Sequence, residues 1–74
     1  MPSSEVIAPT AGLVIRVNAT EGSSVKAGDA VVVLQSMKME IAVCAPARGM
    51  VREIRCAEGR SVQSGQALVI MGEA

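Results

Sequence analysis

The chain of 74 residues contains no phenylalanine, tyrosine, tryptophan or histidine. Its core must therefore be built from Val, Ile, Leu, Met and Ala, and a chain this short buries only about 60% of the surface that its unfolded form exposes. Without histidine it lacks the commonest general base. Its glycines are scattered singly, so a glycine-rich phosphate loop is also missing. These absences predict one small domain with no catalytic residues of its own.

Net charge and long apolar runs are lacking as well. Seven basic and seven acidic side chains cancel, and with no basic run and no aromatic residue for stacking, nucleic-acid binding is not expected. No apolar run exceeds five residues, as at 30–34 and 67–71, whereas a transmembrane helix needs about 20. We therefore expect no membrane insertion. No signal peptide is recognisable, which favours an intracellular location, the cytoplasm or alternatively the mitochondrial matrix.

Cysteine is scarce. Cys44 and Cys56 are the only two, twelve positions apart, and without histidine or a second cysteine pair the spacing of zinc ligands is absent. We expect no metal site. Both thiols are predicted to be reduced and to act as small apolar residues on strands.

An internal repeat is the main positive feature. A shift of 37 positions produces eleven identities among the 26 positions from 8 to 33, too many for chance in so short a chain. The identical positions in the first copy are Ala8, Pro9, Gly12, Val14, Glu21, Gly22, Ser24, Val25, Gly28, Ala30 and Val32. The repeat predicts a single domain over residues 1–74, with halves at about 5–34 and 44–71 joined by a hairpin over 35–43.

Short runs rich in Val and Ile alternate with Gly, Ser, Asn and Asp clusters, which is typical of an all-β protein. Strands are predicted at 5–8, 13–18, 31–35, 39–45, 50–56 and 68–71, with two very short ones at 24–25 and 61–62. Val14 and Val17 align with Val51 and Ile54, a spacing of three that predicts a bulge. Two such halves can bury one core about an approximate twofold axis. The predicted fold is a flattened eight-strand barrel or sandwich.

The repeat singles out one lysine. Lys26 aligns with Gln63, so we interpret it as solvated, whereas Lys38 lies in the joining hairpin. Under the twofold symmetry this hairpin corresponds to the paired chain termini, so Lys38 and the termini are expected at opposite poles. Its turn contains no Gly, Asn or Asp, the residues that tight hairpins favour. A non-glycine residue with left-handed backbone costs about 1–2 kcal/mol, and such strain often marks function. The alternative is an ordinary exposed lysine between gap-filling methionines.

With both flanking copies, Met37-Lys38-Met39 resembles the tip of a biotinyl domain, the biotin carboxyl carrier module of biotin-dependent carboxylases and decarboxylases. The resemblance covers nearly the whole chain, at 7–9, 12, 21–22, 25–28, 37–40, 45–46, 49, 58–59 and 65. It implies a flattened eight-strand β-barrel with the modified lysine exposed. Family members usually have Glu followed by Ala or Ser before Met-Lys-Met, and this chain has Gln35-Ser36. The short segment 21–28 resembles minimal carriers without a thumb.

The resemblance implies that Lys38 is biotinylated by a biotin protein ligase and carries a carboxyl group from a biotin carboxylase to a carboxyltransferase or decarboxylase. The chain would then be a carrier, not an enzyme. The residues expected to be recognised around the lysine are Gln35, Ser36, Met37, Met39 and Glu40. Alternation with Ile41 and Val43 leaves open that Met39 fills the core.

Two other functions remain open. A lipoyl carrier of a dehydrogenase complex would share this fold, but such domains usually have Asp-Lys-Ala or a similar tripeptide at the tip. The other is an unmodified β-barrel interaction module, which requires neither a lone tip lysine nor flanking methionines.

Overall fold

A computed structural model of the protein describes residues 4–72, which form eight strands and no helix. The strands are β1 (Ser4–Ile7), β2 (Gly12–Val17), β3 (Ser24–Val25), β4 (Ala30–Ser36), β5 (Met39–Cys44), β6 (Gly49–Ile54), β7 (Ser61–Val62) and β8 (Ala67–Gly72). The all-β prediction is confirmed, including the two very short strands. No helix in this part of the chain could cross a membrane.

The strands form two antiparallel sheets of four, in the orders β1-β8-β6-β3 and β5-β4-β2-β7. A shift of 37 residues, added for β1 and β3 and subtracted for β8 and β6, converts the first order into the second. The strand registers agree too, since Val6 lies opposite Val69 in one sheet and Val43 opposite Val32 in the other. The predicted sandwich of two pseudo-twofold related halves is therefore confirmed. Residues 18–29 hold only turns and β3, so no inserted loop interrupts this segment.

The bulge expected from the valine spacing is present in both copies. The register shifts between Val14 and Arg16 where β2 pairs with β4, and between Val51 and Glu53 where β6 pairs with β8. An extra residue in one strand lets side chains three apart face the same side. Val14 and Val51 are accordingly fully buried.

The core is entirely aliphatic. Thirteen hydrophobic residues are buried, and no polar or charged residue of the described chain is buried with them. They are Val6, Ala8, Val14, Val31, Val32, Leu34, Val43, Ala45, Val51, Val62, Leu68, Val69 and Met71. Each sheet contains strands of both copies, and both sheets contribute to this core. Neither copy therefore has a core of its own, and the two copies must fold together.

The cysteines depart partly from expectation. Both are free, but Cys44 at the end of β5 is exposed, and Cys56 lies in the loop after β6 instead of on a strand. The strand expected to reach residue 56 ends at Ile54, where β6 stops pairing with β8. Cys56 is half-buried against the core, and this burial raises the pKa of its thiol.

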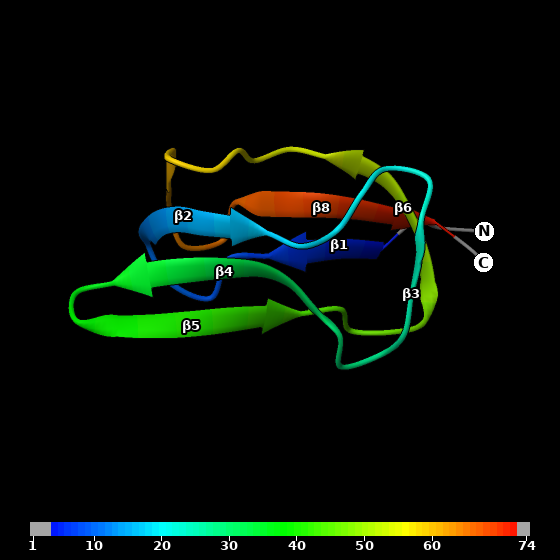
Figure 1. The fold of residues 1–74 in the computed structure, drawn as a ribbon, viewed down its shortest axis with the longest axis horizontal. Helices are drawn as coiled ribbons and strands as arrows, with labels where there is room; N and C mark the ends of the chain where they lie inside the picture. The colour runs from blue at the N-terminus through cyan, green and yellow to red at the C-terminus, as the bar shows by residue number, and fades with distance from the viewer. Residues whose placement is uncertain (1–3, 73–74) are drawn as a thin grey trace.

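The β4–β5 hairpin projects from one end of a molecule measuring 36 × 17 × 17 Å (Figure 1). Ser4 at the start of β1 pairs with Met71 near the end of β8, and both strands run to the opposite end (Figure 1). One pair before the tip of the hairpin, β2 passes so close that a Cβ atom on Gly12 would lie 2.7 Å from the Gln35 carbonyl oxygen. The hairpin thus lies at the end opposite Ser4 and Met71, while the termini themselves, predicted at that opposite end, lie outside the described residues.

Candidate functional site

The tip of the hairpin is a two-residue turn. Ser36 and Met39 form the last cross-strand pair, so Met37 and Lys38 alone connect the strands. Met37 has a φ of 57° and is the only non-glycine residue between residues 4 and 72 with a positive φ. A positive φ at the first central position alone is the pattern of a type II′ turn, where glycine is normally found. The strain expected in this turn therefore lies on Met37, directly before Lys38.

The side chains around the tip are open to solvent. Met37 is 94% exposed and Met39 66% exposed, and Gln35, Lys38 and Glu40 are exposed as well. Ser36 is half-buried. The structure therefore places all six predicted site residues together at the turn and the strand ends beside it.

The interpretation of Met39 as a core residue is wrong. Along β5, Val43 is buried, Ile41 is half-buried and Met39 is exposed. The three alternate residues share one face of the strand. The hairpin extends past the region where a second sheet covers that face, so burial falls along β5 toward the tip.

No described acidic side chain forms an ion pair with the Lys38 amine. The one ion pair in the described part of the chain joins Arg55 to Glu53 at 3.5 Å, so Lys38 and Glu40 do not form one. Instead Glu40 lies opposite Gln35 in the β4–β5 ladder. An amine placed here is accessible from solvent to another macromolecule, and no described side chain is positioned to remove its proton.

Lys38 lines none of four surface depressions, of about 300–480 Å³ each, that lie on residues 4–72. Residues 4–72 contain no group of three or more His, Cys, Asp or Glu side chains suited to a metal ion. The tip therefore presents an exposed amine.

Lys26 offers a comparison within the same chain. It is also exposed, but it belongs to a turn in which its backbone N–H donates to the Asp29 carboxylate at 2.9 Å. Gln63 occupies the same position in the second copy, where its N–H donates to the Gln66 side chain at 3.0 Å. The turn thus forms equally well without a lysine, in agreement with a solvated Lys26.

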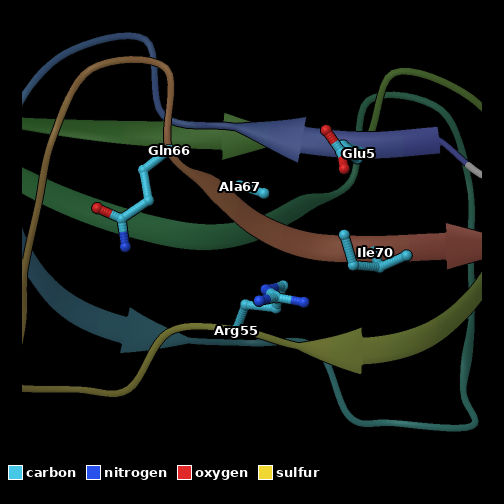
Figure 2. A pocket seen from close by; sticks show the side chains of 5 residues that line it. All are labelled: Glu5, Arg55, Gln66, Ala67 and Ile70. Atoms are coloured by element: carbon cyan, nitrogen blue, oxygen red, sulfur yellow. The ribbon is translucent and has the colours of Figure 1, made fainter.

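Sequence reasoning missed one surface feature. A depression of about 480 Å³ on the sheet formed by β1, β8 and β6 is lined by Glu5, Arg55, Gln66, Ala67 and Ile70 (Figure 2). Arg55 aligns with Asn18 and Gln66 with Asp29 in the repeat. These charge differences between the two copies are the sequence signal that could have indicated this depression.

The biotin/lipoyl family model, described as biotin-requiring enzyme, matches residues 4–71. A search of curated proteins gave no match.

Two similar solved structures are carboxylases. One is a single-chain, multi-domain long-chain acyl-CoA carboxylase, with a TM-score of 0.90, 30% identity and coverage of 97% of this chain. The other is the Kluyveromyces lactis urea carboxylase, with a TM-score of 0.91, 26% identity and the same coverage. This chain spans only 7% and 6% of their respective lengths.

Proposed function

Because the chain belongs to the biotin/lipoyl family of biotin-requiring enzymes, we propose that it is a biotin carboxyl carrier with biotin attached to Lys38. The observation that carries the proposal is the position of this lysine. It lies in the two-residue turn of a projecting hairpin, between two exposed methionines and at the pole opposite the paired ends of β1 and β8. A group attached there is held away from the body of the domain.

The tip suits covalent attachment. The Nζ atom of Lys38, once deprotonated, attacks the carboxyl carbon of an activated biotin. The C–N amide bond forms, the activating group leaves with its electron pair, and the nitrogen loses its second proton. No described side chain is placed to assist, so activation belongs to the partner ligase. Biotin, when bound, supplies a ring nitrogen that accepts and releases a carboxyl group.

The domain contributes by positioning the group attached to Lys38. Leu34 is fully buried, which anchors β4 in the core two residues before the tip begins at Ser36. A side chain held on this hairpin reaches several active sites without tight binding of the domain, because tethering makes each encounter effectively intramolecular. The proposed partners are a biotin protein ligase, a biotin carboxylase, and a carboxyltransferase or decarboxylase. The likeness to two carboxylase structures supports this set.

Lipoate is the second candidate cargo, because the matching family model covers both attachment types. Met37 and Met39 favour biotin. Lipoyl domains usually have Asp-Lys-Ala or a similar tripeptide at the tip, whereas Met37-Lys38-Met39 resembles the tip of biotinyl domains, and both methionines are exposed.

The test is intact-mass spectrometry of the chain after incubation with biotin, ATP and a biotin protein ligase, followed by peptide mapping. We expect one amide-linked biotin, located on Lys38. Lys38→Arg keeps the positive charge but removes the amine, and should abolish labelling with unchanged circular dichroism. Lys26→Arg is the matched control and should label fully. Label on Lys26, or acceptance of lipoate from a lipoate ligase in place of biotin, would overturn the proposal.

A further inference from the structure

The pseudo-twofold symmetry builds the same surface depression twice. One lies over residues 54–57, 60–62 and 66, and the other over residues 18–20, 23–25 and 29–31. Each has a volume of about 430 Å³. Most of their lining residues correspond under the 37-residue shift. Each depression therefore serves as an internal comparison for the other.

Their charges differ. Arg55 and Arg60 line the depression of the second copy, whereas Asn18 and Ser23 hold these positions in the first. The fold does not require the arginines. The N–H groups of Asn18 and Arg55 both donate at 2.8 Å, to the carbonyls of Val31 and Leu68 respectively. The same backbone hydrogen bond forms with either side chain, so the backbone conformation does not require an arginine at position 55.

A third substitution changes the charge in the same direction. Asp29 in the first copy corresponds to Gln66 in the second, and each accepts a hydrogen bond from the backbone N–H three residues earlier. The amide keeps this turn interaction, removes a negative charge and adds an NH₂ donor. The second depression thus has two cationic side chains in its lining and no acidic one, while the first contains a carboxylate.

Nearby carboxylates leave these arginines largely free. Glu53 pairs with Arg55 at 3.5 Å, but both side chains are 55% exposed, and such ion pairs are weak in water. Glu58 is engaged elsewhere, because its carboxylate accepts a hydrogen bond from the Val17 N–H at 3.1 Å. Glu5 lines the neighbouring depression beside Arg55 (Figure 2).

The two depressions face opposite ends of the molecule. The loop of residues 57–66, yellow to orange, lies toward the end that carries the hairpin turn (Figure 1). The corresponding segment 20–29 lies toward the end with the start of β1 and the end of β8 (Figure 1). The cationic copy is therefore the one nearer Lys38.

We propose that the depression between Arg55 and Arg60 docks carboxylate side chains of an acidic segment on the biotin carboxylase that acts on the group carried by Lys38. Guanidinium groups match carboxylates through paired hydrogen bonds. The site is shallow, and both arginines are exposed, so a single small anion would be held poorly, whereas a protein segment adds contacts with the half-buried Ile54 and Cys56. Such docking steers encounter and sets orientation more than it raises affinity. The choice of partner rests on the proposed carrier function.

The first test is a titration of the ¹⁵N-labelled, unmodified chain with a hexaglutamate peptide at low salt, followed by NMR. We expect saturable shifts of amides around residues 55–66 and none around 18–29. The variant Arg55→Asn/Arg60→Ser takes the residues of the first copy and should lose these shifts while keeping the fold. Lys26→Gln/Arg48→Ala also removes two positive charges by exchange with the other copy, and should keep them.

Three outcomes would overturn the inference. These are equal peptide shifts in both double variants, shifts that spread evenly over the surface, and saturation of the same amides by inorganic phosphate at a lower concentration than by the peptide. The last result would indicate a site for small anions. Because the titration needs no biotin, its failure is separate from a failure of Lys38 to be biotinylated.

The second test uses the biotinylated chain as the substrate of a biotin carboxylase. We expect Arg55→Asn/Arg60→Ser to raise KM about fivefold with kcat unchanged, because the variant loses two exposed charge pairs with the partner. The control Lys26→Gln/Arg48→Ala should show the KM of the parent chain. Equal KM values for the two double variants would refute docking at this depression.

Discussion

Glu21 and Glu58 each stabilise the opposite half of the molecule. The Glu21 carboxylate accepts a hydrogen bond from the Ile54 N–H at 3.0 Å, and the Glu58 carboxylate accepts one from the Val17 N–H at 3.1 Å. The glycine after each glutamate donates its N–H to the other half at 2.8 Å, from Gly22 to the Val51 carbonyl and from Gly59 to the Val14 carbonyl. The repeated Glu-Gly pair is therefore a reciprocal clasp between the copies.

Removal of either clasp should destabilise the domain. We expect Glu21→Ala and Glu58→Ala each to lower the free energy of unfolding by about 0.5–1.5 kcal/mol, since each leaves a strand amide without its acceptor. Urea denaturation followed by circular dichroism measures this change. Glu53→Ala is the control, because its exposed ion pair with Arg55 should contribute less than about 0.5 kcal/mol. Equal losses in all three variants would show that general charge, not the clasp, is responsible.

Met37→Gly should stabilise the fold. Glycine adopts the φ of 57° at this position without steric strain, which removes about 1–2 kcal/mol of backbone cost. Greater freedom of the unfolded chain offsets roughly 0.5–1 kcal/mol of this gain. A net increase near 0.5–1 kcal/mol is expected in the same denaturation assay. Met39→Gly, at an exposed strand position, should give no increase, and a gain of the same size there would contradict the assignment of strain to Met37.

Gly12→Ala should weaken the packing of β2 against β4 near the tip of the hairpin. The new Cβ would approach the Gln35 carbonyl oxygen to 2.7 Å, a contact with backbone that cannot rotate away. Overpacking of this kind costs about 1–3 kcal/mol, measured as a lower unfolding midpoint in urea. Ala11→Ser changes the exposed neighbour and should leave the midpoint unchanged. An unchanged midpoint for Gly12→Ala would show that β2 and β4 separate easily.

The two thiols should react at different rates. Burial raises the pKa of the Cys56 thiol, so its thiolate is scarcer than in an exposed cysteine, and Cys44 is exposed. At pH 8, iodoacetamide should modify Cys44 first, as followed by peptide mapping. Faster modification of Cys56 would contradict its burial.

The same pKa shift has a consequence for stability. Because the folded state retains the Cys56 proton where the unfolded chain has lost it, stability falls as the pH rises from the ordinary thiol pKa toward the raised one. Cys56→Ala introduces the residue found at position 19 and should lack this part of the alkaline loss. Identical pH profiles of unfolding for the two proteins would contradict the prediction.

Much of the architecture was predictable because the sequence contains an internal repeat. Eleven identities at one shift indicated two equivalent halves, and a chain with no aromatic residue can bury two small apolar faces only against each other. This repetition and the local sequence pattern predict the all-β class, the short strands at 24–25 and 61–62, and the bulges after Val14 and Val51. They also predict that the hairpin lies at one end of the molecule.

The remaining features depend on what lies across from each residue in space. Alternation along β5 is the same for Val43 and Met39, yet one is buried and the other exposed, because the second sheet covers only one of them. Local sequence showed that the turn was strained, but the cross-strand pairing of Ser36 with Met39 placed the strain on Met37. The clasp of Glu21 and Glu58 and the arginines beside one depression join residues far apart in the chain. Only folding brings them together, since their contacts are set by packing of the two sheets and not by neighbouring residues.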